Sequence, residues 1–212
     1  MKVYPLNILK TIGLKSFSWP FVAVLTFCCI IYNMSLTHFI GIAFPLKKLM
    51  TPDTFFNSTS LNLISSVIIA PTIEEIAARG FLSGNRIYFL SLPLLFLAIL
   101  AGFDFSVFSI IIVGITVFFF LALLYKQEYY DVVYNRYVSQ LIIFSCLSFS
   151  LAHVIVIQKY FDFHIALFAS IFVYYPLAYL LAKVRIAYGL RYSIMMHSIH
   201  NVLIISFNSL FY

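Results

Sequence analysis

Long apolar runs recur along the whole chain, and they constrain its fold more than any other feature. Each approaches the roughly 20 residues that an α-helix needs to cross a bilayer. The candidate spans are residues 17–37, 60–82, 87–103, 106–125, 138–157, 164–182 and 192–211. Because lipid offers no partner to backbone polar groups, apolar spans are expected as helices. The sequence therefore predicts an all-α, polytopic transmembrane bundle of about seven spans.

Composition supports one membrane domain. Hydrophobic residues make up 63% of the chain and charged residues 9%, whereas soluble domains carry about 25% charged residues. No polar linker separates two folding units, so we expect a single integral membrane domain over residues 1–212. Basic residues precede the first apolar run, which is long enough to span, so we expect a retained first helix. The three cysteines lie in apolar runs and indicate neither a disulfide framework nor a metal site.

The basic residues predict an orientation. With the N-terminus inside, ten of the 13 Lys and Arg residues fall on the cytoplasmic side, leaving Lys47, Lys48 and Lys159 outside. The positive-inside rule then favours an N-in, C-out topology in a plasma membrane of bacterial type. The cations occur singly or in pairs at the ends of apolar runs, so the net charge of +6 predicts no nucleic-acid partner.

An acidic pair interrupts the second apolar run at Glu74 and Glu75, with Arg79 following. An ionisable group at the bilayer centre costs about 2.5 to 3.5 kcal/mol on insertion scales, so such groups are usually functional. Glu75 and Arg79 are four residues apart and can form an ion pair on one helix face. Glu74 then points about 100° away. Pro71 removes a helical hydrogen bond just before the pair, which either kinks the helix to open a wet cavity or is a packing irregularity.

Two carboxylates in different environments suggest different roles, with Glu74 as general base and Glu75 as its support. Two later spans add His153, and then His197 with Asn201 on one helix face. These residue types fit hydrolysis at a carbonyl, in which Glu74 and His153 deprotonate a water while His197 and Asn201 stabilise the oxyanion. A buried ion pair that only fixes helix packing is the competing interpretation, and a lone histidine such as His153 is often a packing residue.

A metal site is a second use of the same residue types. Zinc hydrolases generally carry a close ligand pair on one helix. Here His197 and His200 form the nearest equivalent, at a spacing of three. We therefore favour no cofactor, with a divalent metal as the alternative and His200 as a packing residue.

Taken together, the motifs resemble the CPBP family of intramembrane proteases, which contains type II CAAX prenyl endopeptidases and bacteriocin-processing, Abi-like proteins. The family pattern is Glu-Glu-x-x-x-Arg, Phe-x-x-x-His and His-x-x-x-Asn, in that order on separate helices. The matching residues are Glu74, Glu75 and Arg79, then Phe149 and His153, then His197 and Asn201. The resemblance covers residues 60–212. It implies a glutamate-dependent protease in which Glu74, His153, His197 and Asn201 are catalytic, and Glu75, Arg79 and Phe149 are supporting.

Three features depart from the simplest match to the family. Ala78 stands where the family often has a bulky aromatic residue, and two extra spans separate the first and second motifs. With a rise of about 1.5 Å per residue, His153 is expected roughly 10 Å nearer the outer side than Glu74 and His197. Bringing these residues together would require a tilted helix, a helix that starts deeper, or a different topology.

The expected function is therefore an intramembrane endopeptidase. It would hydrolyse a membrane-associated, prenylated or leader-bearing peptide or protein with a glutamate-activated water. The alternative is a non-catalytic membrane protein, either an immunity scaffold or a proton-coupled transporter, that uses the same buried polar residues. A transporter would more naturally show inverted repeats and broken helices at matching positions.

Overall fold

The computed structural model describes residues 19–43, 63–83, 88, 91, 114, 117 and 127–211. Its elements are α2 (Trp19–Ala43), the π-helix η1 (Ser65–Ile69), α5 (Ala70–Arg79), the 3-10 helix η2 (Gly80–Ser83), α8 (Gln127–Ala152), α9 (Val154–Ile157), α10 (Phe163–Tyr188) and α11 (Leu190–Phe211). The described part of the chain contains no β-strand. The predicted all-helical class is confirmed for these residues.

Three described helical stretches are long and apolar enough to cross a membrane: Val22–Ile40, Tyr130–Ile157 and Phe163–Tyr188. They correspond to the predicted spans 17–37, 138–157 and 164–182. The predicted spans 87–103 and 106–125, and the N-terminal segment 1–18, lie almost wholly outside the described residues.

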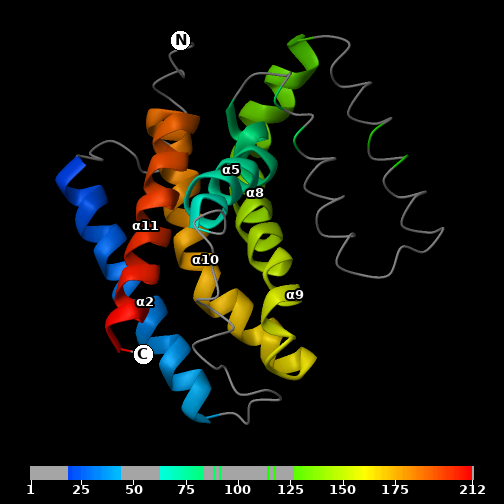
Figure 1. Cartoon of the computed structure of the whole chain (residues 1–212). Coiled ribbons are helices and arrows are strands. Elements are labelled where there is room, and N and C mark those ends of the chain that lie inside the picture. The colour runs from blue at the N-terminus through cyan, green and yellow to red at the C-terminus, as the bar shows by residue number, and fades with distance from the viewer. Residues whose placement is uncertain are drawn as a thin grey trace.

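The predicted spans 60–82 and 192–211, which carry site residues, are also helical where the structure describes them. Neither is among the three stretches. Residues 192–211 lie in the single helix α11. Residues 63–83 are divided instead into η1, α5 and η2, and Figure 1 shows α5 nearly end-on while α8, α10 and α11 are seen lengthwise. The segment with the two glutamates is thus helical throughout but changes its hydrogen-bond register between η1, α5 and η2; it is called the broken segment below, and it is set across its neighbours (Figure 1).

α8 and α10 pack side by side, and the broken segment packs against both of them. A buried cluster joins them, and its members come from α5, η2, α8 and α10: Ala77, Ala78, Phe81, Leu82, Tyr130, Tyr134, Val138, Ile142, Cys146, Phe149, Ala178, Ala182 and Ile186. The hydroxyls of Tyr130 and Tyr134 donate to the carbonyls of Phe81 and Leu82, at 3.3 and 3.0 Å. These bonds satisfy backbone acceptors where the broken segment ends.

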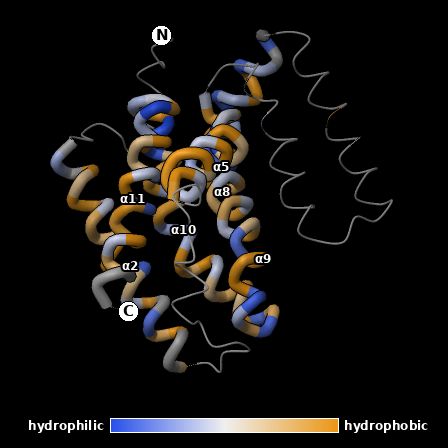
Figure 2. Tube along the Cα trace, viewed as in Figure 1, coloured by the Kyte–Doolittle hydropathy of each residue, from blue (hydrophilic) through white to orange (hydrophobic). Residues whose placement is uncertain are grey.

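α2 covers the opposite side of α10. Its buried residues recur at helical spacing: Val22 belongs to one buried cluster with Leu181 and Val184 of α10, and Ile40 to another with Ala166. Figure 2 shows hydrophobic residues along the lengths of the helices, with hydrophilic positions at helix ends and also between them. Long apolar stretches are expected of helices that lie in an apolar medium.

Candidate active site

Glu75 is the buried centre of a polar cluster. Its side chain and that of Arg79 are both fully buried and form an ion pair, as the four-residue spacing predicts. Ser193 donates from its hydroxyl to the second carboxylate oxygen of Glu75. His197 lies with Nδ1 3.0 Å from Glu75 Oε1 and donates to it. Three donors from two helices therefore satisfy this carboxylate, as a buried charge requires.

Arg79 is held by contacts beyond the glutamate. Its Nη2 donates to the carbonyl of Ala178 on α10 at 3.3 Å. Its guanidinium carbon lies 4.4 Å from the centre of the Phe149 ring on α8, a cation–π geometry. The buried guanidinium of Arg79 thus packs against the ring of Phe149. This contact gives the aromatic residue of the second motif a role that its sequence position alone did not reveal.

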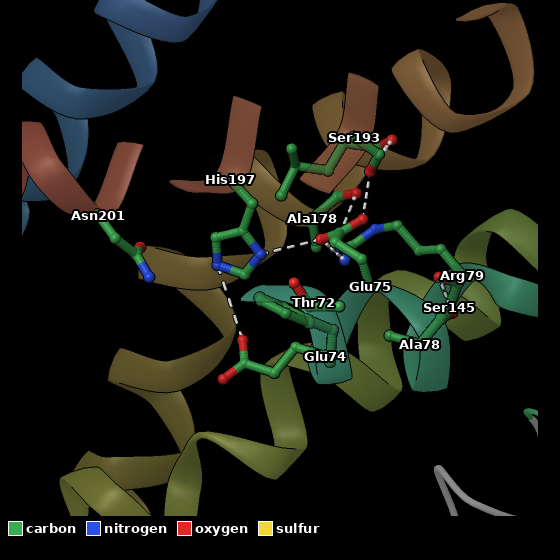
Figure 3. A network of polar contacts seen from close by, with 12 residues as sticks. Thr72, Glu74, Glu75, Ala78, Arg79, Ser145, Ala178, Ser193, His197 and Asn201 are labelled. Atoms are coloured by element: carbon green, nitrogen blue, oxygen red, sulfur yellow. Dashed lines mark hydrogen bonds and ion pairs between the residues drawn. The ribbon is translucent and has the colours of Figure 1, made fainter. Parts of the chain in front are cut away.

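Glu74 lies in a different environment from its neighbour. Its side chain is 36% exposed, and its Oε2 is 3.7 Å from Nε2 of His197. Figure 3 shows the His197 ring between the two glutamates, with one nitrogen toward each. Because Nδ1 donates to Glu75, Nε2 is the ring nitrogen that faces Glu74, at 3.7 Å from its Oε2. The His197 ring therefore lies between the carboxylate of Glu75, which accepts three hydrogen bonds, and that of Glu74, which is partly exposed.

His153 lies where α8 ends and α9 begins. Its Nδ1 is 2.8 Å from the carbonyl oxygen of Phe149, which can only accept, so Nδ1 carries the proton. In the neutral ring Nε2 then keeps a free lone pair. The ring also stacks on Tyr174 of α10, with centroids 4.0 Å apart and an interplanar angle of 25°. No hydrogen bond joins Glu74 to His153 or to Tyr174 within the described residues.

The ring of Phe149 lies close to both His153 and His197. Its centroid is 5.7 Å from that of His197 and 4.6 Å from that of His153. His153 follows Phe149 by one helical turn, which is about 5.4 Å. The expected difference in depth of roughly 10 Å stays a prediction.

Asn201 shares a face of α11 with His197, as predicted, but its amide is directed elsewhere. Its Nδ2 donates to the backbone carbonyl of Ser66 in η1 at 2.9 Å. Figure 3 shows Asn201 apart from the two glutamates. The structure thus gives this amide a backbone partner, while its role toward an oxyanion stays a prediction.

Sequence reasoning missed three residues that complete the cluster. Ser193 precedes His197 by four residues, so the line 193, 197, 201 on one face of α11 was available as a signal. Ser145 donates to the carbonyl of Ala78 at 2.7 Å, and Tyr174 stacks on His153. Nothing in the sequence distinguishes Tyr174 from the chain's other 14 tyrosines.

The two histidines of the alternative metal pair, His197 and His200, have different surroundings. Both nitrogens of His197 face the glutamates, and His200 is buried with no hydrogen-bond partner for Nδ1 among the described residues. No three His, Cys, Asp or Glu side chains of the described ranges gather as a metal site would require.

Comparison with known proteins adds no relative to this description. No protein-family model matches the chain, no curated protein matches it, and no solved structure matches it. The assignment of a function therefore depends on the geometry of the polar cluster and on the motif pattern.

Proposed function

We propose that this protein is an intramembrane endopeptidase of the CPBP type, which hydrolyses a membrane-associated, prenylated or leader-bearing peptide. One observation carries the proposal. Glu75 is buried and accepts from three donors, whereas adjacent Glu74 is partly exposed and has its Oε2 3.7 Å from Nε2 of His197. Pairs of carboxylates with unequal environments are typical of sites that separate a reacting group from a supporting one.

In the proposed reaction, water lies between Glu74 and Nε2 of His153. Glu74 takes a proton as the water oxygen bonds to the carbonyl carbon of the peptide, and the carbonyl electrons move to oxygen. His197 donates from Nε2 to that oxyanion when it is protonated. The tetrahedral intermediate collapses as the C–N bond breaks, and the proton held by Glu74 passes to the leaving amine. No metal or cofactor takes part in this scheme.

The distribution of cations supports the proposed orientation. Arg136 near the start of α8, Arg185 near the end of α10 and Arg191 at the start of α11 belong to the end of the bundle where these termini meet, and α2 begins at that end (Figure 1). Lys159 belongs to the connection after α9, at the opposite end. Under the positive-inside rule this pattern favours an N-in, C-out protein of about seven spans.

The test uses purified protein in liposomes with membrane peptides from the host, and reads new peptide termini by mass spectrometry. Glu74→Gln should abolish cleavage, because the amide cannot accept a proton from water. Glu128→Gln is the matched control, since Glu128 is the exposed glutamate of α8 and lies outside the site. Cleavage by Glu74→Gln at the wild-type rate would exclude the mechanism.

The same experiment separates the alternatives. A scaffold or transporter would give identical peptide termini in wild-type and Glu74→Gln membranes. A metal-dependent hydrolase would cleave, but would lose activity after treatment with a chelator and regain it with added divalent ions. The proposed enzyme should retain its activity after chelation.

A further inference from the structure

The backbone changes its hydrogen-bond register just before Glu74. In the π-helix η1, the N–H of Ala70 donates to the carbonyl of Ser65, five residues back. α5 begins at Ala70, so its first α-type bond runs from Ile73 to the carbonyl of the N-cap residue Ile69. The carbonyls of residues 66–68 fall between these two bonds. They can draw only on the N–H groups of residues 71 and 72.

Pro71 leaves too few backbone N–H donors for these three carbonyls. Proline has no N–H, so Thr72 is the one backbone donor available to three carbonyls. Two side chains supply the missing donors: Asn201 Nδ2 to the Ser66 carbonyl at 2.9 Å, and Thr72 Oγ1 to the Ile68 carbonyl at 2.6 Å. The count of donors and acceptors then closes. In an apolar surrounding, each carbonyl without a hydrogen bond would raise the free energy of the folded state. The side chains of Asn201 and Thr72 avoid this cost by donating to two of the carbonyls.

The bond from Asn201 also ties two helices together across the site. His197 contacts Glu74 and Glu75, and Asn201, one turn further along α11, contacts Ser66. α11 therefore holds the broken segment at two points, one before Pro71 and one after it. Glu74 belongs to the length of chain that these two contacts fix.

We propose that Asn201 is a positioning residue: its amide replaces the N–H that Pro71 lacks, and so fixes the π-to-α junction that orients Glu74. The backbone part of this proposal stands without any assumed activity, whereas its catalytic consequence rests on the proposed function. It differs from direct stabilisation of an oxyanion because it makes Asn201 dispensable whenever residue 71 has an N–H of its own.

A double-mutant cycle tests the dependence of Asn201 on Pro71. Asn201→Ala should lower Tm in detergent by about 3 to 8 °C, because it leaves the Ser66 carbonyl without a donor. Adding Pro71→Ala should restore most of that loss, since it gives position 71 a backbone N–H that can donate to Ser66. Pro176 within α10 gives the matched control. Pro176→Ala should change the Tm of wild type and of Asn201→Ala by the same amount.

Additive effects of Pro71→Ala and Asn201→Ala on Tm would overturn the proposal. If Asn201→Ala yields no folded protein, the same cycle is measured with Asn201→Ser, whose shorter hydroxyl keeps a weaker donor. Rescue by Pro71→Ala, and not by Pro176→Ala, is again the supporting result.

Cleavage rates of the same variants decide whether Asn201 positions Glu74 or contacts the substrate. Asn201→Ala should lower kcat about tenfold or more with little change in KM, and Pro71→Ala should bring kcat back to within about threefold of wild type. Restored Tm with kcat still low would overturn the positioning role in favour of a direct one. If the wild type cleaves nothing, the proposed function fails, and the Tm cycle alone still tests the junction.

Discussion

The polar cluster has two halves that meet at His197, and they differ in how fully their groups are partnered. The closed half, Glu75, Arg79 and Ser193, is fully buried, and its carboxylate accepts from three side chains. The open half is Glu74 and His153. There Glu74 is 36% exposed with its nearest cation-forming partner at 3.7 Å. Adjacent residues of one helix thus reach opposite states of hydrogen-bond saturation.

This contrast suggests that the closed half holds the geometry of the site and that the open half contains the groups available for reaction. A buried carboxylate that already accepts from three side chains is held in place by them, so the closed half is suited to fixing geometry. Within the part of the chain that the structure describes, no donor is bonded to Glu74 or to Nε2 of His153. Helical geometry contributes to the division, because neighbouring side chains diverge by about 100° and so enter different surroundings.

The largest expected effect is on the closed half. Arg79→Met should lower the free energy of unfolding by about 3 to 5 kcal/mol, because it leaves Glu75 as an unpaired buried charge. Reversible unfolding in mixed micelles measures this change. Arg136→Met is the control, since Arg136 is exposed on α8, and should change stability by less than about 0.5 kcal/mol. Equal effects of the two changes would contradict the description of the closed half.

A steric change next to the closed half comes second. Ala78 is 1% exposed and packs against α8, where Ser145 donates to its carbonyl. Ala78→Phe should therefore lower stability by about 2 to 3 kcal/mol through overpacking. The CPBP family, which the motifs resemble, often has an aromatic residue at this position. Ile73→Phe is the control on the exposed face of the same helix, at 61% exposure. An unchanged unfolding midpoint for Ala78→Phe would show that α5 and α8 can move apart.

Sequence reasoning located the residues of both halves better than it described the backbone that carries them. Spacing of four placed Glu75 with Arg79, and His197 with Asn201, because these pairs depend only on helical periodicity. The π-helix at Ser65–Ile69 was not predicted, since Pro71 signals a lost hydrogen bond but not how the chain absorbs the loss. The start of α8 was predicted at residue 138 and observed at Gln127, because hydropathy marks the apolar part of a helix and not its polar end.

Contacts between distant segments were the least predictable part of the site. Tyr174 stacks on His153, and Ala178 accepts from Arg79, only because α10 lies against both α5 and α8. Such contacts depend on helix order in space, which a single sequence does not specify. Ser193 was within reach of the periodicity argument, but a serine in an apolar helix is common enough that its line with His197 passed unnoticed.

A smaller effect is expected for that serine. Ser193→Ala removes one of the three donors to Glu75, and hydrogen bonds to charged groups are worth about 1.5 to 3 kcal/mol. Because Arg79 and His197 stay in place, we expect a loss near the lower end, about 1.5 kcal/mol, in the same unfolding assay. Ser198→Ala on α11 is the control and should have almost no effect. A loss as large as that of Arg79→Met would mean that the hydroxyl, and not the cation, is the main partner of Glu75.

The smallest expected effect on stability belongs to the residue with the largest expected effect on chemistry. Glu74→Gln should change the free energy of unfolding by no more than about 0.5 kcal/mol, because partly exposed ion pairs contribute little. Glu75→Gln should cost several times more, since three donors lose an anionic acceptor. The two substitutions are identical in chemistry and adjacent in sequence, so their difference isolates the environment. If both cost the same, the cluster is one buried ion network that fixes helix packing, and the case for Glu74 as a general base loses its structural support.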